Sequence, residues 1–298
     1  MATKKFTFAQ FKAEYPNDDA CLLAILKRRY ETIEACPNCG VVGKLTRIEG
    51  RRAFACKEGC HIYPCAGTVF EHSSTSLTLW FHAMYLMTST RNGVAGKELE
   101  RQLGVTYKCA WRIGHQLRLL MAARDKAINP GKLSCHVEID ETFIGGKEQG
   151  VMGKPGASSK KVAVLGMVER GAALKTQVVP NTKNETLLPI IEQHVAKGTM
   201  ISTDEFQGYR SLAKLGYGHK AVNHSRKQWV NGQTHTNSVE GFWSHLKNGI
   251  HSTHIHVSKQ HMQKYVDEFA YRYNLRHDPA GMFNQLMASL SRPHREDR

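Results

Sequence analysis

Three acidic residues stand in sequence contexts that could bring their carboxylates together. Asp140 and Asp204 each end a short run of β-strand type, VEID and MISTD. Glu240 lies in the segment SVEGFWSHLK, whose apolar spacing predicts a helix. Acids from two strands and a helix can hold hard divalent cations, Mg²⁺ or Mn²⁺, through their oxygens. A pair of such ions clamps the attacking and leaving oxygens of an in-line phosphoryl displacement, so the pattern predicts phosphodiester chemistry.

Nearby acids compete for places at such a site. Glu138 shares strand parity with Asp140, so both side chains should point to one face of the sheet. Glu141 and Glu205 should point away from these neighbours, and we expect them to orient loops. The two aspartates therefore remain the preferred ligands from the strands.

The segment from about 237 to 249 is predicted to form a helix with a buried and a polar stripe. Glu240, Ser244 and Lys247 share the polar stripe, which places the glutamate and the lysine two turns apart on one side. This arrangement suits a strand of DNA that crosses the site. Asn237 is a rival or partner to Glu240, since an amide oxygen also ligates hard cations. The buried stripe is predicted to comprise Val239, Phe242, Trp243, Leu246 and Ile250.

Two close pairs of cysteines indicate a second metal site near the start of the chain. Between the pairs lies a predicted hairpin that turns at Glu49-Gly50. Four thiolates on two knuckles form a closed tetrahedral cage for structural zinc. The second pair has three residues between its cysteines, where two are commoner, and this remains within known ligand spacings. His61 and Cys65 lie nearby in sequence and could replace a ligand. The predicted zinc ligands are Cys36, Cys39, Cys56 and Cys60.

The region from 96 to 120 has the pattern of a helix-turn-helix unit. A short amphipathic helix ends at Gly104, and Thr106 begins a second helix. Many helical hairpins share this pattern without binding DNA, but the basic charge of the chain favours a DNA-binding role. The exposed residues expected to contact DNA are Tyr107, Lys108 and Arg112, with His115 further along. Those expected to be buried are Ala110, Ile113, Leu117 and Leu120.

Composition narrows the class of partner. The 298 residues include 41 Lys and Arg against 26 Asp and Glu, a formal charge of +15. Such an excess favours a polyanion, because neutralised phosphates release their counterions. The sequence contains no apolar run long enough for a membrane span and no apolar signal region at its start. Together with metal-type cysteine spacing, this predicts a reducing, cytoplasmic setting.

The order of predicted elements indicates a mixed α/β fold. Three strands form a meander, and alternating helices and strands follow, which favours a five-stranded mixed sheet of the ribonuclease H type closed by the Glu240 helix. A last helix is expected at 258–276, and a Pro/Gly linker at 125–133 marks the main boundary. The predicted divisions are an N-terminal helical segment (1–30), a zinc ribbon (31–72), a helix-turn-helix-like region (73–125), a catalytic domain (133–280) and a tail (281–298).

Four segments together resemble one known family. VEIDETFIGGK, STDEFQGY, HTNSVEGFWSHLK and YVDEFAYRYNLR are similar to segments of the ISXO-type transposases of bacterial insertion sequences, which are DDE-class enzymes with an amino-terminal zinc ribbon. The similarity extends over nearly the whole chain, from DDACLLAILKRRYETIEACPNCG to Arg276.

The resemblance implies a ribonuclease H-like domain, two magnesium ions, and cutting and joining of terminal inverted repeats and target DNA. It implies Asp140 and Asp204 as the first two acids, either Glu240 or Asn237 as the third, and Lys247 after it. We expect Glu240, and we expect a homo-oligomer in the synaptic complex. The alternative is a DNA-binding regulator whose ribonuclease H-like domain is vestigial.

Overall fold

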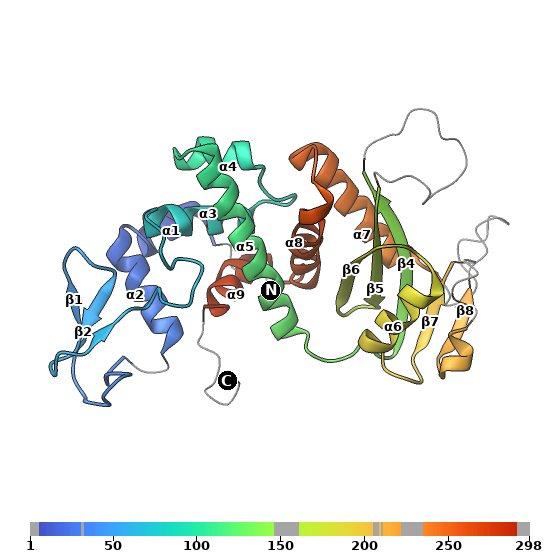
Figure 1. Ribbon diagram of the computed structural model, residues 1–298, viewed down its shortest axis with the longest axis horizontal. Coiled ribbons are helices and arrows are strands. Elements are labelled where there is room, and N and C mark those ends of the chain that lie inside the picture. Colours follow the sequence, from blue (N-terminus) through green and yellow to red (C-terminus); the bar gives the residue numbers. More distant parts are fainter. Residues whose placement is uncertain are drawn as a thin grey trace. The chain divides into compact units, whose positions relative to one another are not determined.

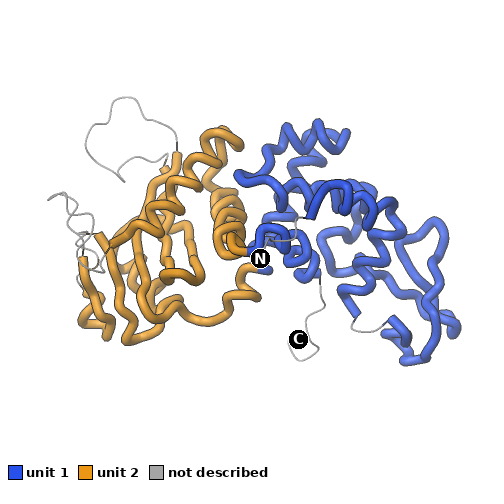
Figure 2. Tube along the Cα trace, turned by 180° about the vertical axis from the view of Figure 1, so that it is seen from behind, with its two compact units in different colours: residues 1–124, 278–298 blue, residues 125–277 orange. Residues whose placement is uncertain are grey.

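The computed structural model describes residues 6–30, 33–145, 161–204, 209, 211–221 and 235–290. Glu205 and residues 291–298 of the predicted tail lie outside this range. The chain divides into two compact units (Figure 2). Unit 1 comprises residues 1–124 and 278–298, and unit 2 comprises residues 125–277.

A small antiparallel sheet forms the ribbon of unit 1. Its three strands are β1 (Thr46–Ile48), β2 (Ala53–Ala55) and β3 (His61–Ile62), in that order. Gly50 adopts a positive φ of 69° in the turn between β1 and β2, a conformation that costs glycine little. The predicted hairpin and its turn are therefore confirmed, and the third strand extends the sheet.

Helices make up the rest of unit 1. Asn17 caps α2, since its Oδ1 accepts from the Ala20 N–H at 2.9 Å. The carboxylate of Asp18 then accepts from the N–H groups of Leu77 and Thr78, which fixes the start of α3 against α2. The helices are α1 (Phe8–Glu14), α2 (Asp18–Arg29), α3 (Leu77–Ser89), α4 (Gly96–Leu103), α5 (Tyr107–Ile128), which runs on into unit 2, and α9 (Met282–Ala288).

The sequence predicts that the last helix lies at 258–276, but the structure has a further helix after it, α9. It follows the short turn η6 (Pro279–Gly281) and packs against α3 in unit 1. The ring of Phe283 lies 6.3 Å from that of Phe81 and 5.6 Å from that of Tyr15. The helix thus returns the end of the chain to the aromatic core of the first unit.

A five-stranded mixed sheet forms the centre of unit 2 (Figure 1). The first three strands form an antiparallel meander, and the last two run parallel to the first. This is the ribonuclease H-type arrangement that the sequence predicts. Across the sheet the order is β6 (Leu174–Val179), β5 (Val162–Glu169), β4 (His136–Ile144), β7 (Met200–Thr203) and β8 (Gly218–Ala221).

Helices cover both faces of this sheet and create two separate cores. On one face α6 (Asn184–His194) buries Leu187 and Ile191 against strand residues such as Val137 and Ile139. On the other face α7 (Asn237–Asn248) and α8 (Met262–Asn274) pack on Val164 and its neighbours. Two short 3-10 helices are η2 (Ala213–Leu215) and η5 (Lys259–His261), and η5 precedes α8. The segment η4 (Gly249–His254) is a π-helix. No helix in the described part of the chain is long and apolar enough to cross a membrane.

Candidate functional site

One cleft in unit 2 gathers the acidic residues that the sequence singles out. It encloses about 450 Å³ and is open to solvent. Its lining includes Asp140 of β4, Asp204 directly after β7, and Glu240 and Lys247 of α7. Asn237 is exposed at the start of α7 and is not among the lining residues. The remaining lining residues are Glu141, Thr142, Thr236, Trp243 and Ser244.

The register of two parallel strands brings the aspartates close together. Glu138 of β4 pairs with Ser202 of β7, two residues before Asp140 and Asp204 respectively, and the charge of Asp204 acts on the Asp140 carboxyl. The sequence analysis put both aspartates at strand ends, and this is wrong for Asp140, since β4 continues to Ile144 in its hairpin with β5. Strand β7 ends at Thr203; among the residues that the structure describes, nothing pairs with this edge of β4 beyond Glu138, and Asp140, Glu141 and Thr142 line the cleft there.

Burial and mutual repulsion disfavour the charged form of Asp140. Removal from solvent raises the pKa of this carboxyl to about 6, and the negative charge of Asp204 adds to the rise. A hydrogen bond from the Trp243 indole to Oδ2, at 2.9 Å, acts in the opposite direction. A divalent cation between the aspartates would remove the repulsion and favour both carboxylates.

Glu141 also faces this cleft. Burial, with added repulsion from Asp204 and Asp140, raises its pKa to about 7, although the hydroxyl of Tyr209 donates a hydrogen bond to Oε2. Sequence parity placed this side chain away from Asp140. Because the edge of β4 is open beyond β7, side chains of both parities border the same space.

Glu138 shares a face with Asp140, as parity predicts, but it is fully buried and anchors helix α7. Its Oε2 accepts from the N–H groups of Ser238 and Val239 in the first turn of that helix, at 2.8 and 3.3 Å. Arg170 Nε donates to its Oε1 at 2.7 Å, and His235 Nδ1 lies 3.0 Å from the same oxygen. A negative charge at a helix N-terminus and beside an arginine is stabilised on both sides.

Helix α7 presents the polar stripe that its sequence predicts. Glu240, Ser244 and Lys247 all line the cleft. The hydroxyl of Thr236, the N-cap residue, donates to Glu240 Oε1 at 2.7 Å and orients that carboxylate. The predicted buried stripe is confirmed at all five positions: Val239, Phe242, Trp243, Leu246 and Ile250. Sequence reasoning missed that Trp243 also reaches Asp140, because periodicity shows only that it faces inward.

The donor set of the cleft fits hard divalent cations. Carboxylates suit Mg²⁺ and Mn²⁺, and the pKa of Asp140 is raised first by burial and then by the negative charges of Asp204 and Glu240, which a cation would offset. Within the described ranges, the three acids do not form a group as compact as the cysteines discussed below. Two ions about 3.5–4 Å apart can bridge carboxylates that are too widely spaced to share one ion.

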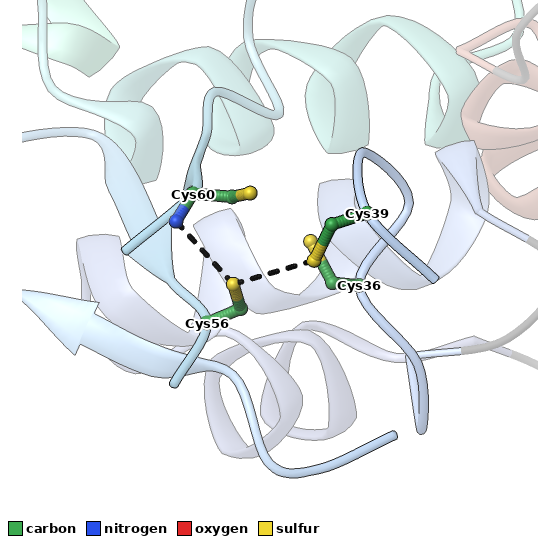
Figure 3. A group of neighbouring side chains, drawn as sticks. All are labelled: Cys36, Cys39, Cys56 and Cys60. Carbon is green, nitrogen blue, oxygen red and sulfur yellow. Dashed lines mark hydrogen bonds between the residues drawn. The ribbon is translucent and has the colours of Figure 1, made fainter. Parts of the chain in front are cut away.

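The four predicted zinc ligands gather in the ribbon (Figure 3). Their sulfur atoms all lie within 4.8 Å of one another, and those of Cys39 and Cys56 are 3.8 Å apart. Zinc–sulfur bonds of about 2.3 Å in a tetrahedron require sulfurs about 3.8 Å apart, so the set fits structural zinc. Burial acts to raise the pKa of the Cys36 thiol, but hydrogen bonds from the backbone N–H groups of Cys39 and Asn38 outweigh it. The resulting pKa is about 7. His61 and Cys65 do not belong to the group.

The helix-turn-helix unit is present, with α4 and α5 joined at Gly104 in the left-handed conformation. Tyr107 and Lys108 are exposed at the start of α5. Arg112 is exposed as well, but its guanidinium donates to Ser73 Oγ at 3.1 Å. His115 is buried and stacks on the ring of Trp111, contrary to its predicted exposure. The four predicted core positions are buried: Ala110, Ile113, Leu117 and Leu120.

Comparison with known proteins agrees with this organisation. Residues 132–274 match the ISXO2-like transposase domain, and residues 16–62 match the transposase zinc-ribbon domain. An uncharacterized protein in transposable element ISH50 of Halobacterium salinarum is 26% identical over 80% of this chain and 84% of its own length. An uncharacterized transposase-like protein of Haemophilus influenzae is 32% identical over 33% of this chain and 79% of its own length.

Two solved structures show a distant similarity. The Mos1 transposase paired-end complex with left transposon end is 10% identical, with a TM-score of 0.30, over 70% of this chain and 78% of that one. The Mos1 strand transfer complex is 13% identical, with a TM-score of 0.28, over 72% and 78%. Scores this low add nothing to the assignment. The sequence matches to the catalytic and ribbon domains show that the chain belongs to the family of ISXO2-like insertion-sequence transposases.

Proposed function

We propose that this transposase cleaves DNA at the terminal inverted repeats of its element and joins the freed ends to target DNA, with Asp140, Asp204 and Glu240 holding two Mg²⁺ or Mn²⁺ ions. The observation that carries the proposal is the single cleft lined by these three acids. When bound, the ions supply an activated water and stabilise charge on the oxygens of the scissile phosphate.

Each cleft residue has a part that follows from its position. Asp140 lies on β4 and Asp204 directly follows the neighbouring strand β7, so the pairing of these strands limits the separation of the two aspartates. Glu240 is the third ligand, because it lines the cleft while Asn237 is exposed outside it. Lys247, two turns along the same helix, offers a positive charge to the phosphates of a strand that lies across the cleft.

Unit 1 supplies DNA binding in this proposal. Tyr107 and Lys108 are exposed at the start of α5, where a recognition helix contacts base edges and phosphates. Arg112 is held by Ser73, so its contribution includes fixing the helix as well as any contact with DNA. The zinc ribbon adds a rigid knuckle to the same unit. Two copies of the chain would hold the two element ends together in a synaptic complex.

The decisive experiment is strand cleavage by the full chain on a duplex that carries the inverted repeats flanking the gene, with Mg²⁺. Asp140→Asn, Asp204→Asn and Glu240→Gln should each abolish cleavage while end-binding persists. Glu185→Gln removes an exposed acid from α6, on the opposite face of the sheet, and should cleave like the natural chain. Cleavage retained in any of the three cleft variants would refute the assigned site.

One further variant separates the two candidates for the third ligand. Asn237→Ala should retain cleavage if Glu240 is the ligand, and Glu240→Gln should not. The reverse result would move the third ligand to Asn237. A natural chain that binds the repeats but cuts nothing with either Mg²⁺ or Mn²⁺ would favour a DNA-binding regulator with a vestigial cleft.

A further inference from the structure

We propose that Trp243 is a positioning residue for the first catalytic acid. Its indole N–H donates to Asp140 Oδ2 at 2.9 Å and fixes the orientation of that carboxylate toward the cations. The inference rests on the proposed function, because it assumes that Asp140 is a metal ligand. It adds a residue that is neither a ligand nor part of the DNA-binding surface.

The bond has an ordinary N–H···O length, is partly buried, and has the indole as its donor. Trp243 is 4% exposed and packs beside Phe242, whose ring centre lies 5.1 Å away. An indole nitrogen carries a hydrogen to donate and has no lone pair for a metal. It therefore holds one carboxylate oxygen without competing for the cation, and the remaining lone pairs of Asp140 keep a constant direction. Neighbouring groups that orient a ligand in this way commonly change metal affinity by 10- to 100-fold.

Gly166 gives Trp243 the space it needs. It is the cross-strand partner of Asp140, on β5. A Cβ atom at this position would lie 2.5 Å from Cζ2 and 2.7 Å from Cη2 of Trp243, closer than carbon atoms approach. Gly166 is absent from the glycines with positive φ, so its backbone does not require glycine. The indole ring that bonds to Asp140 occupies the space that a side chain at Gly166 would need.

Helix α7 is attached to β4 at two points that are two residues apart on one strand face. Glu138 holds the first turn of the helix, and Asp140 accepts from Trp243 on the second turn. The same helix carries Glu240 one turn before Trp243, so the second attachment also fixes the third ligand relative to the first. A residue with a purely structural role would stabilise this packing but would not change metal affinity once the protein is folded.

The test is Mn²⁺ binding to the full chain without DNA, measured by electron paramagnetic resonance of the free ion. Trp243→Phe keeps the ring and removes the donor, and we expect binding at least tenfold weaker. Trp80→Phe is the matched control, because Trp80 is equally buried and its Nε1 donates to Ser73 Oγ at 3.0 Å in the other unit. Both variants lose one buried indole bond, but only Trp243→Phe should weaken Mn²⁺ binding. Unchanged affinity in folded Trp243→Phe would overturn the inference.

A second variant leaves both partners chemically intact. Gly166→Ala should push the indole away from Asp140 and weaken Mn²⁺ binding, whereas Gly241→Ala, where an added Cβ meets nothing within 4 Å, should leave it unchanged. If both cleft variants fail to fold, nitrogen-15 labelling of tryptophan in the natural chain decides the matter. The Trp243 indole resonance should then shift as Mg²⁺ is added, and a resonance that does not respond would overturn the inference.

Failure of this inference can be distinguished from failure of the proposed function. Asp140→Asn should weaken Mn²⁺ binding whether or not Trp243 has a role. If it does so and Trp243→Phe does not, the site stands and the positioning role is wrong. If Asp140→Asn binds Mn²⁺ like the natural chain, the proposed metal site itself is wrong.

Discussion

The zinc ribbon and the proposed metal site of the acidic cleft are built in opposite ways. The zinc ligands lie within 25 residues of chain, from Cys36 to Cys60, and their sulfurs lie within 4.8 Å of one another. The acids of the cleft span 101 residues, from Asp140 to Glu240, and depend on strand register and a helix from a later part of the chain. The first site can be recognised from spacing alone. The second depends on the whole fold of unit 2 and forms a cleft of about 450 Å³ that is open to solvent.

Loss of zinc should have the largest effect on folding. Cys60→Ser removes one of four thiolates from a closed site, and structural zinc in small domains contributes about 10–16 kcal/mol of apparent binding free energy. We expect the ribbon to unfold, and end-binding to be lost with it. Limited proteolysis at the ribbon and zinc content after dialysis would measure this. Cys135→Ser, at an exposed cysteine of unit 2, is the control and should retain both. A folded ribbon in Cys60→Ser would show that the four sulfurs do not act as one site.

Neutralising one cleft acid should affect chemistry and leave the fold intact. Asp204→Asn reduces the negative charge that holds the cations, which contribute several kcal/mol of transition-state stabilisation. We expect cleavage to fall by roughly a thousandfold or more, since each 1.36 kcal/mol is a factor of ten. The melting temperature of unit 2 should stay nearly the same or increase. An Asp204→Asn protein that unfolds as readily as Cys60→Ser would remove the contrast between the two sites.

Removal of the Glu138 side chain, which anchors helix α7, should reduce stability by an intermediate amount. Glu138→Ala removes the buried carboxylate that accepts from Arg170 Nε and from the first-turn N–H groups of α7, and broken buried pairs cost about 3–5 kcal/mol. Urea unfolding of the full chain would give the change in free energy. Glu185→Ala at an exposed position is the control and should change it by less than about 0.5 kcal/mol. An equal effect of the two substitutions would show that Glu138 does not hold the helix.

The smallest expected effect is a pH dependence of stabilisation by Mg²⁺. The pKa values of Asp140 and Glu141 are raised to about 6 and about 7, so in the absence of metal these groups favour folding most at low pH. That contribution is lost as the pH rises through these values, since the folded state then holds unfavourable charges. Added Mg²⁺ should therefore raise the melting temperature more at pH 8 than at pH 5. An equal rise at both, or the opposite order, would contradict the placement of the cations.

The sequence predicts much of this molecule where the signal is local. The hairpin at Gly50, the four zinc ligands and the buried stripe of α7 follow from spacing and periodicity. Tertiary contacts explain what was missed. Periodicity shows that Trp243 faces inward, but not that it reaches Asp140 across a glycine on another strand. Helix α9 has only seven residues, and it is held by aromatic contacts with distant helices rather than by a strong pattern of its own.

Local sequence patterns also fail to show which side chains are exposed and where strand pairing ends. Glu141 borders the cleft because β7 stops early, which strand parity within β4 does not show. His115 follows the exposed start of α5 in sequence, yet it is buried under Trp111. Local patterns therefore identified the acids and the elements that carry them. The neighbours that orient them required the coordinates.

The central claim is that Asp140, Asp204 and Glu240 jointly hold divalent cations. Anomalous scattering from crystals of the full chain with Mn²⁺ and inverted-repeat DNA tests it most directly. The account predicts two manganese peaks in the cleft, each bound by oxygens of these three acids, with Asn237 outside the coordination shell. Crystals with manganese elsewhere and none between the acids would contradict it.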